Sequence, residues 1–227
     1  EARSLPLYPD FEAQEDGSWR FISRELSFYR DLKSGRIIDT WDNPFTGKRN
    51  AVVHVANDPV NSVFAANGPR GPLLLPWNGA GDDLMMTFNV PLSYPNPLPP
   101  KDFPEESSGE TYVGSAHFMF FTRRAALDDP ALKEAPASYG WTRVGPWLPW
   151  MKMGTHEGNL LYIAQGHKLA GIEALPADMQ ALIKSTYPDY ATAPASWSQP
   201  NESSWTYYRK LKDKEKAAAA AQPEAGH

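Results

Sequence analysis

The 227-residue sequence contains no cysteine. This absence excludes thiol nucleophiles, disulfide bonds and metal sites built on thiolates. No apolar run approaches the ~20 residues that a membrane-spanning helix needs, so we expect no membrane span. The chain begins at Glu1 rather than at an initiator Met. We therefore expect that an upstream piece has been removed and that any signal peptide was lost with it.

Positive charge is also scarce. The net charge is −5 and the pI is near 5.6, which argues against a surface for nucleic acid or anionic membranes. The basic residues are scattered except for a cluster between Arg209 and Lys216. Asp213 and Glu215 interrupt this cluster, so it predicts a solvated helix face rather than a phosphate site. We expect no nucleic-acid partner.

Common catalytic and metal-binding motifs are missing as well. The histidines show neither His-x-His nor His-Glu-x-x-His spacing. No Gly-x-Ser-x-Gly segment offers a nucleophilic serine. The glycine-rich segments near Gly68 and Gly79 lack the lysine and helix of a phosphate loop. We therefore expect no metal and no cofactor.

Proline and aromatic residues, in contrast, are abundant. The 22 prolines are roughly twice the average usage and predict long ordered loops between short strands. Aromatic residues make up 12% of the chain and include 8 Trp. Large rings either fill a barrel or line a pocket for an apolar ligand, and both alternatives stay open.

The segment 39–61 is the most informative stretch of the chain. Turn-forming residues cluster at 43–47 and again at 57–61. The β-branched segment 50–56 between these turns predicts a strand that carries His54. Strands are also predicted at 19–29 and 36–41, which would complete a three-stranded meander.

The strongest strand prediction is 111–124, because both of its faces are largely apolar, as in a central strand. Further strands are predicted at 84–90, 139–144 and 160–164. The proline-rich segment 91–109 predicts a long loop that forms a lid, a rim or a disordered excursion. Helices are predicted over 176–186 and from Trp205 onward.

These elements predict a mainly β fold. We expect an antiparallel β-barrel or strongly curved sheet of calycin-like, lipocalin-like type, with one or two peripheral helices after residue 176. Residues 1–200 would form a single barrel-like domain, and residues 201–227 would form a C-terminal helical tail.

Two groups of motifs carry a resemblance to a known family. The first runs from Asp31-Leu32-Lys33-Ser34-Gly35 through the turns at 42–47 and 57–61. The later motifs lie at 153–154, at 158–162 and between Lys168 and the helix that follows Leu175. From about residue 16 to 195, the chain resembles a bacterial family known as domain of unknown function 1838. The resemblance implies further strands before the present start and an exported protein, periplasmic or secreted, and it carries over no catalytic residue.

The histidines are the first candidates for a site. His54 and His117 both lie on predicted strands with apolar neighbours, so in a barrel they could converge inside the cavity. With Asp58 or Glu157 they would supply acid–base chemistry or two metal ligands. The alternative, which we favour, is that each is a core or rim histidine with one backbone partner. His156 falls in a Gly-Thr-His-Glu-Gly loop that predicts an exposed turn.

Aromatic residues beside prolines and on strands are the second set of candidates. They are Trp41, Trp77, Trp141, Trp147, Trp150 and Tyr162, together with Phe118 or Phe121. Such rings either cap the end of a barrel, which we favour, or form the mouth of a pocket.

We predict a protein that binds a small apolar or aromatic molecule in the barrel. The polar contacts would come from His54, His117 and Tyr162, and the apolar walls from Trp41, Trp77 and Phe121. One alternative is an enzyme, such as an isomerase, hydratase or hydrolase, that uses His117 and His54 as acid and base. Another is a protein-interaction module whose exposed aromatic side chains dock a partner.

Overall fold

The computed structural model describes residues 2–6, 10–13, 19–64, 67–68, 71–72, 78–132 and 135–221. Its largest layer is a five-stranded antiparallel sheet of order β11-β12-β13-β14-β15. These strands are β11 (Asn78–Ala80), β12 (Asp83–Pro95), β13 (Thr111–Arg123), β14 (Ser138–Gly145) and β15 (Leu160–His167). The prediction of a mainly β chain with a large antiparallel sheet is confirmed.

The other strands form smaller antiparallel sheets. One three-stranded sheet contains β1 (Ala2–Pro6), β4 (Glu25–Tyr29) and β7 (Val55–Asn57), and a second contains β2 (Asp10–Ala13), β3 (Trp19–Ile22) and β8 (Ser62–Phe64). The two-stranded sheets are β5 (Thr40–Asp42) with β6 (Arg49–Ala51), and β9 (Asn67–Gly68) with β10 (Gly71–Pro72).

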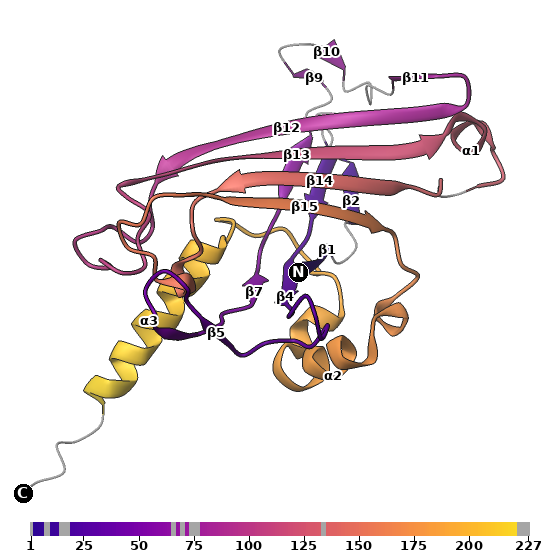
Figure 1. Cartoon of the computed structure of the whole chain (residues 1–227). Helices are drawn as coiled ribbons and strands as arrows, with labels where there is room; N and C mark the ends of the chain where they lie inside the picture. Colours follow the sequence, from indigo (N-terminus) through magenta and orange to yellow (C-terminus); the bar gives the residue numbers. More distant parts are fainter. Residues whose placement is uncertain are drawn as a thin grey trace, which may run out of the picture.

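Three α-helices and three short 3₁₀ turns complete the described chain. The helices are α1 (Arg124–Asp128), α2 (Ala177–Thr186) and α3 (Ser204–Ala220), and the turns are η1 (Pro149–Met151), η2 (Ile172–Ala174) and η3 (Pro188–Ala191). The two longer helices were predicted. Figure 1 shows the five-stranded sheet as the upper layer, with β4, β7, α2 and α3 beneath it. None of the described helices has the length and apolar character required to cross a membrane.

The predicted closed barrel is not formed by the described strands. Within the five-stranded sheet, β15 pairs only with β14, so this edge stays open. At the other edge, β11 pairs with only the first residues of β12. The sheet is therefore an open upper layer over a separate lower layer.

Two predicted strands are each divided between sheets. The predicted strand 19–29 breaks after β3, where the Ser23 N–H donates a hydrogen bond to Asn61 Oδ1 at 2.9 Å. The predicted strand 50–56 breaks after β6, where the Val52 N–H donates to the Asp39 carbonyl at 2.9 Å. His54 therefore lies in the connection between β6 and β7 rather than on a strand.

The predicted loop from residue 91 was also placed wrongly at its start, because β12 continues through Pro91 to Pro95. Proline lacks an N–H and is tolerated in a strand whose outer side has no partner. Pro91 pairs with Ser115 on one side, and among the described strands β11 reaches no farther along β12 than Met85.

Two hydrophobic cores flank the middle of the molecule. In the first, Tyr112 stacks on Tyr94 at 4.7 Å between ring centroids and meets the edge of Trp205 of α3 at the same distance. In the second, Leu26 and Phe28 of β4 pack against the buried face of α2. The domain boundary at residue 200 stays a prediction, although Trp205 and Tyr208 are buried in the same core as Tyr112.

Candidate ligand-binding site

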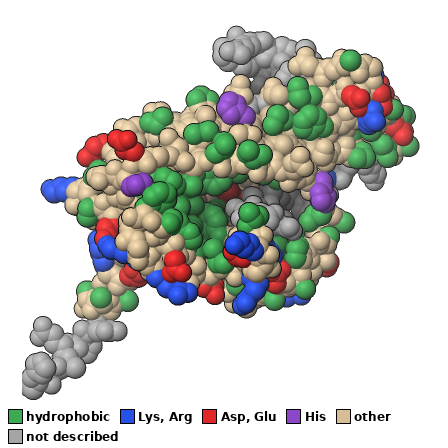
Figure 2. Space-filling model, in the orientation of Figure 1, with side chains coloured by type: hydrophobic (Ala, Val, Ile, Leu, Met, Phe, Trp, Pro, Cys, Tyr) green, Lys and Arg blue, Asp and Glu red, His purple; other side chains and the backbone are tan. Residues whose placement is uncertain are grey.

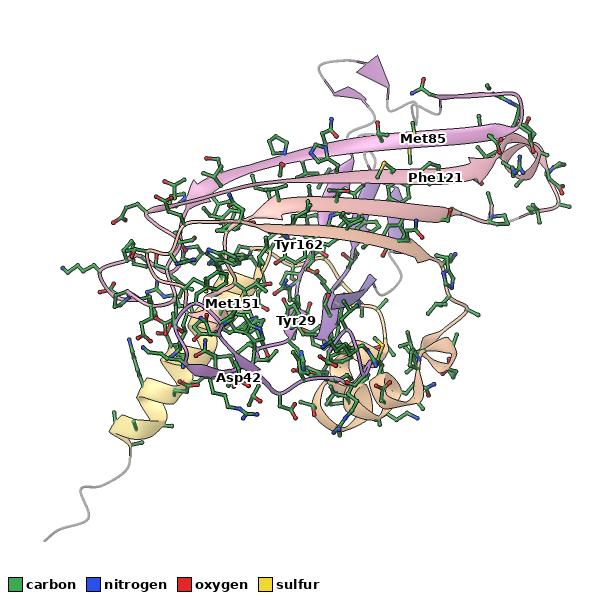
Figure 3. All side chains as sticks on the ribbon, in the orientation of Figure 1. Tyr29, Asp42, Met85, Phe121, Met151 and Tyr162 are labelled. Atoms are coloured by element: carbon green, nitrogen blue, oxygen red, sulfur yellow. The ribbon has the colours of Figure 1, made fainter. Side chains whose placement is uncertain are left out.

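The molecule is hollowed between the five-stranded sheet and the layer beneath it. Figure 2 shows this hollow with hydrophobic side chains in its wall. Tyr162 and Tyr29 lie in the space between the two layers (Figure 3). Tyr162 extends from the inner face of β15, and Tyr29 stands at the end of β4. The residues around these two tyrosines form the candidate site.

Aromatic side chains of β13, β14 and β15 form the wall on the sheet side. Trp141 lies between Phe118, at 6.3 Å, and Tyr162, at 5.7 Å between ring centroids. Phe120 and Tyr139 form a neighbouring pair at 6.2 Å. All five side chains are only partly buried, and neither hydrophobic core of the described chain includes them. We call these five residues the aromatic wall.

Glu25 faces the same space from β4. Strand alternation turns Leu26 and Phe28 toward α2 and leaves Glu25 and Tyr29 on the side of the sheet. The Asn57 side chain donates a hydrogen bond to Glu25 Oε2 at 3.1 Å. Burial raises the pKa of Glu25, and this effect exceeds the lowering by Asn57 and Arg143. Glu25 therefore holds its proton to higher pH than an exposed carboxyl group.

Arg143 lies on the inner face of β14, directly opposite Tyr162 of β15. Its guanidinium donates a hydrogen bond to the Tyr112 hydroxyl, and its Cζ is 5.9 Å from the centre of that ring. Burial acts to lower the pKa of Arg143, but Tyr112, Tyr162 and Glu25 together raise it. The guanidinium is therefore positively charged. Arg143 and Glu25 interact electrostatically, but the ion pairs of the described residues do not include this pair.

The phenol groups of Tyr29 and Tyr162 share this environment. Burial is the main cause that raises the pKa of both hydroxyls. Both phenols therefore stay protonated at neutral pH and can donate a hydrogen bond. Glu25, Arg143, Tyr29 and Tyr162 together form the polar end of the hollow.

The structure does not bring the two predicted histidines together. His54 is buried, stacks on Tyr29 at 6.0 Å and meets the edge of Phe28 at 5.4 Å. Its Nδ1 accepts a hydrogen bond from the Tyr29 N–H at 3.3 Å. Burial lowers the pKa of His54, which favours the neutral imidazole. His117 instead lies exposed on the outer face of β13, where its Nδ1 is 2.7 Å from Asn89 Oδ1.

The predicted aromatic contacts are also separated. Tyr162 lies in the polar end of the hollow, whereas Trp41 packs edge-on against Trp150 in the first core at 5.9 Å. Phe121 is 41% exposed on the outer face of the sheet. Trp77 lies outside the described residues. A ligand role for these residues stays a prediction, and only Tyr162 joins the polar groups described above.

The sequence interpretation missed Glu25 and Arg143. The sequence does contain a signal for Arg143. Strand alternation places Arg143 on the same face of β14 as Tyr139 and Trp141, so a charged residue lies on an otherwise aromatic face. Glu25 follows Arg24, and two charged residues in succession are typical of an exposed segment. The inward orientation of Glu25 depends instead on the pairing of β4 with β7, in which Glu25 lies opposite Asn57. That register is not visible in the sequence.

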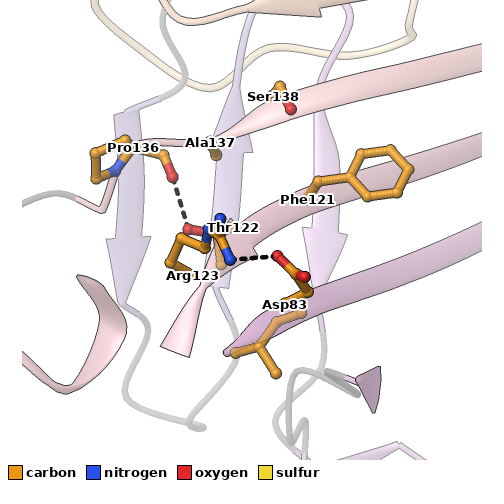
Figure 4. Close-up of a pocket in the computed structure, with 8 residues that line it drawn as sticks. Asp83, Phe121, Thr122, Arg123, Pro136, Ala137 and Ser138 are labelled. Carbon is orange, nitrogen blue, oxygen red and sulfur yellow. Dashed lines mark hydrogen bonds and ion pairs between the residues drawn. The ribbon is translucent and has the colours of Figure 1, made fainter. Parts of the chain in front are cut away.

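A second concavity, of about 520 Å³, lies at the far end of the β12–β13 hairpin (Figure 4). Phe121 is on its rim, and the Thr122 hydroxyl donates to the Pro136 carbonyl at 2.6 Å. Its only strong charges pair with each other, since Arg123 contacts Asp83 at 2.5 Å. The interior hollow is the better candidate because buried polar groups converge there without pairing directly. No metal-binding group of three His, Asp or Glu residues occurs in the described ranges.

Comparisons with known proteins identify one family. The sequence model of a family described as "Protein of unknown function (DUF1838)" matches residues 10–212. This match includes both Glu25 and Arg143. No curated protein and no solved structure matches the chain.

Proposed function

This chain belongs to the DUF1838 family, and we propose that it binds a small apolar or aromatic molecule in the hollow between its two layers. In this proposal the five-stranded sheet covers one side of the ligand, as the sheet of a calycin does, but it does not close into a barrel. The aromatic wall contacts the body of the ligand, and the polar end orients it.

The observation that carries the proposal is the position of the aromatic wall. Aromatic side chains normally contribute most when they are packed in a core. Here Phe118, Trp141 and Tyr162 stay partly accessible and belong to neither hydrophobic core of the described chain. Aromatic surface left in an interior hollow is stabilised when an apolar ligand covers it.

The neutral fluorescent probe N-phenyl-naphthylamine tests this proposal. We expect its emission to rise on binding, and Trp141→Ala to weaken its affinity about tenfold, since a lost aromatic contact removes roughly 1–2 kcal/mol. Thr142→Ala is the matched control because Thr142 is the next residue of β14 and faces outward. Equal binding by both variants and the unchanged protein would contradict the proposal. Native mass spectrometry of freshly purified protein would show a co-purified ligand directly.

The enzyme alternative that uses His54 and His117 has less support. His54 lies beneath the sheet against Tyr29, and His117 lies on the outer face, so the two imidazoles do not share a substrate. General acid–base catalysis requires both groups within hydrogen-bond reach of the same reacting molecule.

A second candidate function, protein interaction, is supported by the outer face of the five-stranded sheet. Val113, Leu161 and Ile163 are 63%, 62% and 77% exposed there. The outward-facing side chains of β12 from residue 85, of β13 up to residue 121 and of β15 include no Asp, Glu, Lys or Arg. Strand spacings of about 4.8 Å and rises of about 3.3 Å per residue give this face roughly 500 Å² in plan, and its apolar side chains alternate with polar ones such as Asn89, His117 and Gln165.

The occupant that we propose for this face is a second copy of the chain. Two such faces meet without repulsion between Asp, Glu, Lys or Arg side chains. The free edge of β15 also lacks the proline and charge that protect edge strands. Sedimentation should show a dimer that Ile163→Lys dissociates, with Lys168→Ala as the control; a monomeric unchanged protein would refute this candidate.

A further inference from the structure

Arg143 presents to the hollow a positive charge that has no direct ion pair among the described residues. A buried charge normally has an opposite charge in direct contact, because its desolvation is costly otherwise. Arg143 has one hydrogen bond within the described chain, and its acceptor is the neutral hydroxyl of Tyr112. Among the described residues, no second hydrogen bond joins this guanidinium to a protein acceptor. The site therefore has capacity for an acceptor that the protein does not supply.

The neighbouring polar groups do not fill this role. Glu25 acts electrostatically on Arg143 but forms no ion pair with it among the described residues, and it accepts a hydrogen bond from Asn57. Tyr162 is the cross-strand neighbour of Arg143, and its hydroxyl is a donor. The hydroxyl donors of Tyr29 and Tyr162 and the permanent positive charge of Arg143 thus surround the same space.

We propose that the ligand of this hollow is an organic acid, with its carboxylate or sulfonate held by Arg143 and its apolar body against the aromatic wall. This inference rests on the proposed function, since it concerns the same hollow. A guanidinium offers paired N–H groups that match the two oxygens of such an anion. The Tyr112 hydrogen bond holds the guanidinium in place, so little side-chain freedom is lost on binding.

A matched pair of probes tests this inference. Anilinonaphthalene sulfonate carries one sulfonate, whereas N-phenyl-naphthylamine has the same ring framework without it. We expect the protein to prefer the sulfonate probe, and Arg143→Met to weaken that probe about tenfold to a hundredfold, as for a lost charge-assisted hydrogen bond. The neutral probe should keep its affinity within about threefold. Arg143→Lys should recover part of the loss, because it restores the charge without the paired geometry.

Arg123→Met is the control variant, since Arg123 pairs with Asp83 on the exposed hairpin end. It should change neither affinity. If the unchanged protein binds neither probe, the proposed function fails. If the neutral probe binds and Arg143→Met leaves the sulfonate probe unchanged, the organic-acid inference is overturned while the proposed function stands. An equal loss of both probes in Arg143→Met also overturns it, because only the sulfonate should sense the charge.

Discussion

At the scale of single residues, the buried carboxyl group of Glu25 costs stability when it is ionised. Its pKa is raised, so the folded protein holds this proton more tightly than the unfolded chain does. The stabilising effect of the proton is complete below the ordinary pKa of 4.5, and it is lost as the pH rises through the folded-state value. An ionised Glu25 at higher pH is a desolvated charge without a direct counterion.

We therefore expect Glu25→Gln to be more stable than the unchanged protein at neutral pH and similar to it near pH 4. Glutamine keeps the shape and the contact to Asn57 but never ionises. Urea unfolding between pH 4 and 8 measures the difference. Glu105→Gln is a control of opposite sign, since the hydrogen bond from Lys48 lowers the pKa of Glu105. A Glu25→Gln effect that is constant over this pH range would contradict the explanation.

His54 gives a second prediction at this scale. It is buried between Phe28 and Tyr29 and accepts a backbone hydrogen bond, so His54→Ala should cost about 2–3 kcal/mol of stability. Its pKa is lowered, so its stabilising effect is present above the ordinary value of 6.5 and is lost as the pH falls through the folded-state value. The pH dependence of urea unfolding should therefore flatten in the variant. A loss of probe affinity without loss of stability would instead indicate a ligand contact.

At the scale of elements, helix α3 is held at its start by a capping box. The Thr206 N–H donates to Ser203 Oγ at 3.3 Å, and the Ser203 N–H donates to Thr206 Oγ1 at 2.8 Å. This cap orients Trp205, which meets Tyr112 in the first core. We expect Ser203→Ala to cost about 1 kcal/mol in urea unfolding, whereas Ser203→Asp retains the acceptor and stays within a few tenths. Equal stability of all three proteins would show that the cap is unimportant.

The predictability of the elements depends on whether their signals are local. Strand β13 was predicted because both of its faces are apolar over thirteen residues, and α2 because its apolar spacing follows Pro176. The breaks after β3 and β6 were not predictable, since they depend on contacts from Asn61 and Asp39, far away in the chain. Strand β12 runs through Pro91 because β11 has already ended.

The candidate site shows the same division. Tyr162 was recognised as an aromatic residue on a strand, and its inward orientation follows from alternation along β15. Glu25 and Arg143 come from strands in different layers, separated by more than a hundred residues of sequence. Their electrostatic interaction is a result of how the layers stack. No local pattern in either strand could have predicted it.

At the scale of the whole molecule, the hollow adjoins the hydrophobic cores, since Tyr29 of its polar end packs against the first core and Glu25 precedes Leu26 of the second. Helix α3 and the turn η1 contribute buried residues to the first core, and helix α2 contributes buried residues to the second. The burial of polar groups in the hollow lowers the stability of the fold, as the raised pKa of Glu25 indicates. A ligand that contacts both layers should offset this loss of stability and make the two layers unfold together.

We accordingly expect an organic-acid probe to raise the melting temperature of the protein. A ligand that binds only the folded state at about 100 times its Kd adds about 2.7 kcal/mol, which is roughly 5–10 °C for a chain of this size. Differential scanning calorimetry with anilinonaphthalene sulfonate measures this shift. In Arg143→Met the same concentration should produce a much smaller shift, because its affinity falls while the cores on either side remain intact. An equal shift in both proteins would mean that the probe binds elsewhere, for example on the exposed outer face of the sheet.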